Sequence, residues 1–246
     1  MTRHLTTYEA PRFWPIRIKD HAFTIRPSAG PHPLRESIPL GVVLRDVLKV
    51  VKTVAEAKRV LAEGRILVDG KVKVDHKLPV GLMDVIYLKS SDSYYRVVPD
   101  KINKLALTKI TAEEASFKLV RIQGKRTLKN KTVQLNTHDG RSITLKVDDP
   151  FNIQLGYRPF DALKISLPDG QILESIPMEA DTYVAVIGGT NIGSYGVLSE
   201  SIPNRDPEKP AKVIIGDAMV TVILKYLFPI GKGSPIINIS GTGEVA

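Results

Sequence analysis

Cysteine is absent from the 246 residues, which excludes disulfide bonds, thiolate metal sites and cysteine nucleophiles. Long apolar runs are missing too, since no stretch approaches the roughly 18 consecutive apolar residues of a membrane-spanning helix. The first residues, MTRHLTTYEAPRFW, contain no continuous apolar segment, so we expect no secretory signal peptide. These absences predict a protein of the cytoplasm.

Catalytic motifs are equally scarce. The five histidines, at positions 4, 21, 32, 76 and 138, form no H-E-x-x-H motif and no close cluster, and no G-x-S-x-G occurs. The glycine-rich string GGTNIGSYG at 188–196 matches neither of the common phosphate-binding patterns, so we expect a turn between strands there. We therefore predict a protein that is not an enzyme, with no catalytic residue, metal site, cofactor or small-molecule substrate.

Charge of one sign dominates part of the chain. The net charge is +9, and residues 1–150 carry 28 Lys+Arg against 16 Asp+Glu, a net of +12. Residues 151–246 carry 7 against 10, a net of −3, and the two parts sum to +9. A basic balance favours an anionic partner, of which nucleic acid is the leading candidate. The uneven distribution places the main polyanion contact in the first three fifths of the chain.

Residues 1–37 are predicted to form an extended arm, because prolines fix φ and lack a backbone donor. The prolines are Pro11, Pro15, Pro27, Pro31 and Pro33. Arg26, His32 and Arg35 are candidate RNA contacts, since a segment that is already extended loses less entropy on docking. Three aromatic residues could stack on bases, although such residues more often anchor an arm to a core. They are Phe13, Trp14 and Phe23.

Helical spacing first appears over residues 38–52. Apolar residues recur on one face at Leu40, Val43, Leu44, Val47, Leu48 and Val51. Arg45, Lys49 and Lys52 fall on another face, which predicts an amphipathic helix with a basic stripe. A second helix is expected at about 54–63, with Thr53 and Glu56 as a capping box, Gly64 as its end, and Lys58 and Arg59 pointing away from its apolar side.

The string RILVDGKVKV predicts a β-hairpin, because Asp69-Gly70 lies between β-prone runs. A two-residue loop would pair Val68 with Lys71. A three-residue loop would pair Val68 with Val72 and keep one face apolar, so we prefer that register. Lys71 would then lie at the tip, and Lys73 would follow it.

The rest of the chain is predicted to be mostly β. Turn signals separate short β-prone runs at THDGR (137–141), DDP (148–150) and PDGQ (168–171), and TAEEA (111–115) predicts a single helical turn. Strands are expected at YVAVIGG, GVLSES, KVIIG and TVILKYLFPIG, and the terminal GTGEVA is expected to be loose. PVGLMDVIYL predicts a turn and a further strand.

A dense basic run occupies residues 118–131, KLVRIQGKRTLKNK, and no acidic residue occurs from Ala115 to His138. An unopposed run of this kind suits a phosphate backbone, and the simpler alternative is an exposed hairpin. The two interpretations are compatible, because such loops often become ordered on RNA.

The string TVAEAKRVLAEGRILVDGKVKVD resembles a small RNA-binding domain found in a primary small-subunit ribosomal protein, some pseudouridine synthases and some tyrosyl-tRNA synthetases. Further strings narrow the resemblance: RPSAGPHPLRESIPL, PVGLMDVI, THDGRSI, VIGGTNIGSYGV and PIGKGSPIINIS occur in the same order as in the archaeal and eukaryotic small-subunit ribosomal family usually called S-four-e. The likeness extends over nearly the whole chain.

The resemblance implies an α+β, multi-module fold. Its parts would be an N-terminal arm (1–37), a helix–helix–hairpin RNA-binding module (38–90), a central β domain (91–176) and a KOW-like small β-barrel with C-terminal strands (177–246). It also implies a structural constituent of the small ribosomal subunit, with small-subunit rRNA and neighbouring ribosomal proteins as partners. An RNA-modifying enzyme such as a pseudouridine synthase, or a KOW-containing transcription or translation factor, is the alternative.

Basic residues of the N-terminal three fifths are the candidate RNA contacts. They are Arg26, His32, Arg35, Arg45, Lys49, Lys52, Lys58, Arg59, Lys71, Lys73, Arg121, Lys125, Arg126, Lys129 and Lys131.

Overall fold

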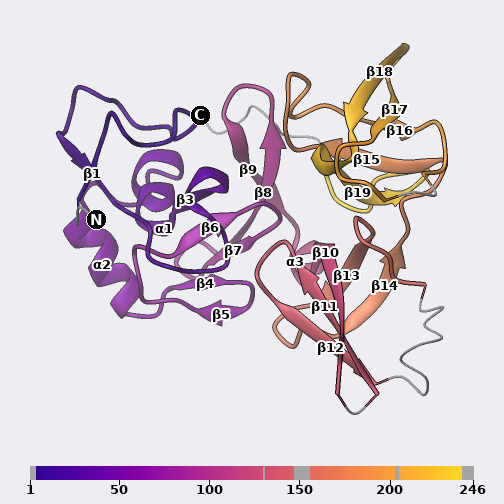
Figure 1. The fold of residues 1–246 in the computed structure, drawn as a ribbon. Helices are drawn as coiled ribbons and strands as arrows, with labels where there is room; N and C mark the ends of the chain where they lie inside the picture. Colours follow the sequence, from indigo (N-terminus) through magenta and orange to yellow (C-terminus); the bar gives the residue numbers. More distant parts are fainter. Residues whose placement is uncertain (1–3, 130, 147–155, 203–204, 240–246) are drawn as a thin grey trace. The chain divides into compact units, whose positions relative to one another are not determined.

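The structure is a computed structural model, and it describes residues 4–129, 131–146, 156–202 and 205–239. The described chain divides into two compact units, one ending at Ser116 and the other beginning at Phe117 (Figure 1). Strands dominate both units and helices are few, so the expectation of a mostly β chain is confirmed. None of the helices in the described ranges is long and apolar enough to cross a membrane.

The arm folds against the first unit. Its short strands β1 (Leu5–Thr6) and β2 (Phe23–Thr24) pair antiparallel, and a 3-10 turn, η1, covers Leu34–Glu36. As the prolines predict, no α-helix occurs in its described residues before that turn. Trp14 is only 4% exposed and donates from Nε1 to the Ser37 carbonyl at 2.8 Å. Trp14 is therefore an anchor rather than a stacking platform.

The first helix is shorter than the predicted 38–52. Strand β3 (Ser37–Pro39) pairs with β6 (Pro79–Gly81), and the helix follows as α1 (Leu40–Val42) and a π-turn, η2 (Val43–Val47). It ends where Lys49 adopts φ 52° and the chain turns to bury Val51. The expected basic stripe does not exist as a helical face, because Lys49 and Lys52 lie beyond the helix.

The second helix confirms its capping signals. Helix α2 covers Val54–Ala62, the Thr53 hydroxyl accepts from the Glu56 amide at 3.2 Å, and Gly64 has φ +67°. Ala57 and Leu61 are fully buried on its inner face. Local sequence signals therefore fix both ends of this helix.

The preferred register of the following hairpin is wrong. Strands β4 (Ile66–Val68) and β5 (Lys71–Val72) pair Val68 with Lys71, which leaves the two-residue turn Asp69-Gly70, with φ 52° and 74°. The Asp69 carboxylate accepts from the Val85 amide at 3.0 Å, and its own amide donates to the Val85 carbonyl at 2.8 Å. Val72 is 49% exposed, so no buried face required the three-residue loop.

One sheet completes the first unit, in the order β5-β4-β7-β8-β9. The remaining elements are β7 (Val85–Leu88), β8 (Ser93–Asp100), β9 (Lys104–Ile110) and the short helix α3 (Ala112–Ala115). Thr111 caps α3 by accepting from the Glu114 amide, so the predicted helical turn at TAEEA is confirmed.

The second unit begins with a five-stranded antiparallel sheet in the order β12-β11-β10-β13-β14. Its strands are β10 (Phe117–Leu128), β11 (Thr132–Thr137), β12 (Ser142–Lys146), β13 (Ala162–Ser166) and β14 (Ile172–Ile176). The predicted turns at THDGR and PDGQ join β11 to β12 and β13 to β14. The predicted turn at DDP lies outside the described residues.

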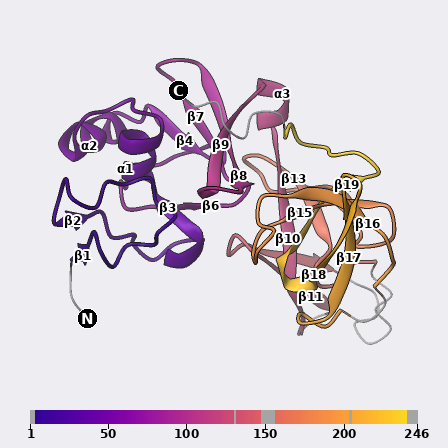
Figure 2. The same cartoon turned by 90° about the horizontal axis from the view of Figure 1, so that it is seen from above.

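A second five-stranded sheet follows in the order β18-β17-β16-β15-β19. Its strands are β15 (Thr182–Val186), β16 (Tyr195–Leu198), β17 (Pro210–Ile215), β18 (Ala218–Ile223) and β19 (Leu227–Lys232), with a 3-10 turn, η3 (Leu224–Tyr226), before the last. The sheet curves around its own apolar core (Figure 2). A Cβ on Gly196 would collide with the Ile214 carbonyl, so a glycine at this position allows the backbones of β16 and β17 to approach closely. The terminal GTGEVA lies outside the described residues.

Candidate nucleic-acid interface

A polar groove of about 410 Å³ lies in the first unit, between the arm and the end of the first helix. Four of its basic side chains come from distant segments: Arg17, His21, Lys49 and Lys52. The positive φ of Lys49 turns the chain at this point. Arg45 also lines the groove, but its guanidinium binds the Asp46 carboxylate at 2.8 and 2.9 Å. Folding thus gathers basic side chains that are separated in the sequence, and Asp20 and Asp46 line the same groove.

Helix α2 presents Lys58 and Arg59 to solvent, opposite its buried face. Lys58 also acts on His76: burial lowers the pKa of His76, and the charges of Lys58 and Lys77 lower it further, against the opposing effect of Asp75. Lys58 and Lys77 are therefore close enough to act on the same imidazole. The hairpin next to this helix leaves Lys71 exposed and Lys73 half-buried.

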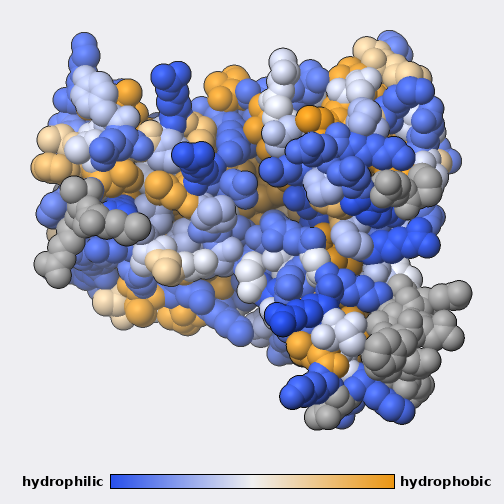
Figure 3. Space-filling model, viewed as in Figure 1, coloured by the Kyte–Doolittle hydropathy of each residue, from blue (hydrophilic) through white to orange (hydrophobic). Residues whose placement is uncertain are grey.

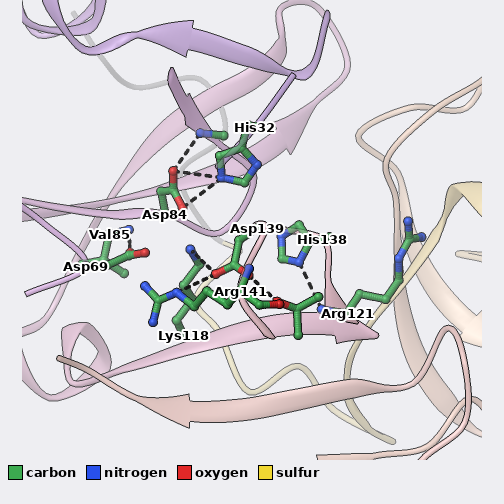
Figure 4. A network of polar contacts seen from close by, with 11 residues as sticks. His32, Asp69, Asp84, Val85, Lys118, Arg121, His138, Asp139 and Arg141 are labelled. Atoms are coloured by element: carbon green, nitrogen blue, oxygen red, sulfur yellow. Dashed lines mark hydrogen bonds and ion pairs between the residues drawn. The ribbon is translucent and has the colours of Figure 1, made fainter. Parts of the chain in front are cut away.

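The arm residues separate into different environments. His32 is 7% exposed, and its Nε2 lies 3.1 and 3.2 Å from the two Asp84 carboxylate oxygens (Figure 4). Asp84 also accepts from the Gly81 amide at 2.8 Å. Buried in this way, His32 cannot reach RNA, which corrects the expectation for this residue. Arg35 is exposed and Arg26 is half-buried.

The basic run 118–131 occupies β10 and the turn after it, and its two halves differ. Lys118 and Arg121 are buried, whereas Arg126, Lys129 and Lys131 are exposed and Lys125 is half-buried. The expectation that all six cations face an RNA is therefore wrong for the first two. Beyond a bulge between Ile122 and Gly124, the strand leaves the core as an outer hairpin with β11.

Lys118 belongs to a buried ionic network. Its Nζ lies 3.1 Å from Asp139 Oδ2, and Arg141 Nε lies 3.0 Å from the same oxygen (Figure 4). Burial would raise the pKa of Asp139, but the charges of Lys118, His138 and Arg141 and a hydrogen bond from Thr137 lower it to about 2. Asp139 therefore stays ionised and holds Lys118 inside the unit.

Arg121 joins the two sheets of the second unit. Its Nη1 donates to the carbonyls of Lys225 and Leu227 at 2.9 and 2.6 Å, and the guanidinium lies near the rings of Phe160 and Phe228. Its backbone amide donates to His138 Nδ1 at 3.1 Å. Arg121 is thus a packing residue. His138 and Asp139 both bind residues of β10, His138 through the Arg121 amide and Asp139 through Lys118.

Sequence reasoning missed Arg17 and His21, the basic residues that the arm contributes to the groove. Together with Arg12 and Lys19 they lie within ten residues, and this local density of basic residues was a usable signal. In the described part of the chain, no group of three or more His, Asp or Glu side chains is placed to hold a metal ion.

Comparisons with known proteins identify the family of the chain. The sequence profile of the ribosomal family S4e matches residues 91–172, and that of the RS4NT (NUC023) domain matches residues 1–35. The small ribosomal subunit protein eS4 of Staphylothermus marinus is 41% identical over 241 residues, covering 96% of this chain and 95% of that protein. The protein of the same name from Ignicoccus hospitalis is also 41% identical, over 96% of this chain and 94% of that protein.

A solved structure shows a similar fold. The crystal structure of the 30S ribosomal protein S4e from Thermoplasma acidophilum aligns with a TM-score of 0.64 and 33% sequence identity. The alignment covers 80% of this chain and 96% of that one.

Proposed function

The chain belongs to the ribosomal family S4e, and from this premise we propose that it is a structural constituent of the small ribosomal subunit that binds small-subunit rRNA. The observation that carries the proposal is the 41% identity, over 96% of the chain, to proteins named as small ribosomal subunit proteins. These relatives are ribosomal proteins, so the chain is not an enzyme, and the pseudouridine synthase alternative is set aside. We place it in the ribosome, in the cytoplasm, beside rRNA and other ribosomal proteins.

Two exposed basic surfaces would make the RNA contacts. The first, which we call the groove surface, consists of Arg17, His21, Lys49 and Lys52 of the groove with Lys58 and Arg59 of α2 and Lys71 of the hairpin. The second, the hairpin tip, consists of Arg126, Lys129 and Lys131. Lysine and arginine side chains neutralise phosphates and release counterions, so several contacts on one rigid surface add up.

Arg26, Arg35, Arg45, Lys73 and Lys125 remain proposed contacts of lesser weight. Arg26, Lys73 and Lys125 are half-buried, Arg45 is paired with Asp46, and Arg35 belongs to neither surface. The boundaries at 37, 90 and 176 and the KOW-like character of the last module also stay proposals. A separate five-stranded sheet after residue 176 supports the last boundary. The boundary at 90 falls within the first unit, because the sheet that contains β4 and β7 continues through β8 and β9 to Ile110.

Salt-dependent binding tests the proposal. The purified chain should bind small-subunit rRNA, and its affinity should fall on the order of a thousandfold between about 50 and 200 mM salt if six or more phosphates are contacted. The double variant Lys58→Glu/Arg59→Glu should weaken binding strongly. The matched control Lys225→Glu/Lys232→Glu reverses two exposed charges, one in η3 and one in β19, and should have little effect.

Sedimentation gives the second readout. In a sucrose gradient at high salt, the chain should migrate with small subunits at near-equal stoichiometry. A chain that stays at the top of the gradient and binds rRNA without salt dependence would overturn the proposal.

A further inference from the structure

Edge strands expose unpaired backbone donors and acceptors, and proteins usually protect them with short length, charge, proline, a bulge or a cover. Most edges of the described sheets follow this rule. Strands β5, β9 and β12 contain lysine, β14 contains Glu174 and pairs through a bulge, and the small sheets have strands of two or three residues. The outer strand β19 contains Pro229 and a bulge, and the Ile236 amide covers it by donating to the Ile230 carbonyl at 2.9 Å.

Strand β18 is the exception among the described edges. It reads AMVTVI from Ala218 to Ile223, with no charge, proline or glycine, and it pairs with β17 without a bulge. A two-residue turn, Gly216-Asp217, joins the two strands, and Gly216 has φ +61°. The strand is therefore a six-residue edge without any of the usual protections.

The register determines which backbone groups point outward. The turn makes Ile215 and Ala218 a hydrogen-bonded pair, and the pattern alternates along an antiparallel ladder, so residues 220 and 222 also bond to β17. Met219, Thr221 and Ile223 consequently direct their amides and carbonyls away from the sheet. In the described ranges of the chain, no backbone hydrogen bond satisfies these groups.

The same three residues place their side chains on the outer face of the sheet. Met219 is 62% exposed and Ile223 41%. Met219 lies opposite Ile214, which is 39% exposed and pairs in turn with Val197. Apolar side chains therefore continue from the open edge across three strands, and apolar atoms appear at this hairpin in the space-filling view (Figure 3).

We propose that β18 is a docking edge for an extended segment of another protein of the small subunit, which adds a strand beside β18 and places alternate apolar side chains against Met219 and Ile223. Outward amides and carbonyls are complementary to a polypeptide strand. They do not suit RNA, because Lys212, which lies opposite Thr221 on β17, is paired with Glu200 at 2.8 Å.

The inference rests on the proposed function in one respect, which is that the chain sits in a particle with other proteins. Hydrogen exchange tests it on small subunits purified from cells that carry the chain. The amides of Met219, Thr221 and Ile223 should exchange at least about tenfold more slowly in the particle than in the free chain. The amides of Val220 and Val222 bond to β17 in both states and serve as the internal reference.

Two variants of Thr221 and one control variant distinguish a docked strand from mere burial. Thr221→Lys keeps the amide but adds a charge at the edge, and it should return the exchange of residues 219 and 223 to the free rate. Ser234→Lys adds the same charge at an exposed loop of the same unit and should change nothing. Thr221→Pro removes one outward donor without touching the bonds to β17 and should act like Thr221→Lys.

A benzophenone side chain at position 219 identifies the partner. A cross-link to a peptide of another ribosomal protein, together with protection of the three amides, supports the proposal. Cross-linking to RNA, cross-linking to a second copy with dimers in sedimentation equilibrium, or unprotected amides in the particle would each overturn it. If the chain is absent from the particle altogether, the proposed function itself fails.

Discussion

The two halves of strand β10 carry similar basic residues but have opposite environments. Lys118 and Arg121 lie in the inner half, where each has partners inside the unit, and Arg126, Lys129 and Lys131 lie in the outer half or in the turn after it. The comparison shows that charge density alone cannot separate a buried structural cation from an exposed one. What separates them is whether a carboxylate or carbonyl is buried within reach.

The largest expected effect concerns Lys118. Lys118→Met leaves Asp139 buried without its closest cation from β10, and removing one partner of a buried ion pair costs about 3–5 kcal/mol of unfolding free energy. Urea titration followed by hydrogen exchange of the β10 and β13 amides measures this loss. The double variant Lys118→Met/Asp139→Asn should recover most of it. A loss of less than about 1 kcal/mol for the single variant would show that Arg141 alone holds Asp139.

Arg121 comes next. Arg121→Ala leaves the Lys225 and Leu227 carbonyls without their charged donor, and hydrogen bonds to charged groups contribute about 1.5–3 kcal/mol each, so we expect a loss of about 3 kcal/mol in total. The affinity for rRNA, measured at a temperature where the variant is fully folded, should stay the same. Reduced affinity with unchanged stability would move Arg121 to the RNA-binding group.

The pH dependence of stability tests the same inner half. The pKa of Asp139 is lowered from 3.8 to about 2 in the folded chain, so its contribution is fully present above pH 4 and is lost as the pH falls toward 2. The size of this contribution is about 2 kcal/mol. Asp139→Asn should flatten the stability profile between about pH 4 and 2. An identical acid transition in the variant would assign the effect to other carboxylates.

How much of this could be predicted from the sequence depends on the distance between partners along the chain. Helix α2 was predictable because Thr53, Glu56 and Gly64 act within one turn of its ends. The burial of His32 was not, because Asp84 lies 52 residues away. The predicted hairpin register was wrong for a similar reason, since contacts with Val85, 16 residues away, fix the turn at Asp69.

The candidate site follows the same rule. Exposure of Lys58 and Arg59 follows from the helical period, which the sequence contains. The gathering of Arg17 and His21 beside Lys49 depends on how the arm folds back, which no local pattern encodes. Lys118 and Arg121 look like their neighbours in sequence, and only the positions of Asp139 and Leu227 in space distinguish them.

The smallest effect on stability should come from the outer half of β10 and the turn after it. The triple variant Arg126→Ala/Lys129→Ala/Lys131→Ala changes exposed side chains that have no buried partner within the described part of the chain, so the unfolding free energy should change by less than about 0.5 kcal/mol per residue. The same variant should weaken rRNA binding and reduce the salt slope of the affinity by about 1 for each phosphate that the side chains no longer neutralise. Filter binding at several salt concentrations measures both quantities. An unchanged slope would remove the hairpin tip from the interface and leave the groove surface as the main proposed RNA contact. A reduced slope with unchanged stability would support different roles for the two parts of the basic run. Its first part would then contribute cations to the core, and its last part would contribute cations to RNA binding.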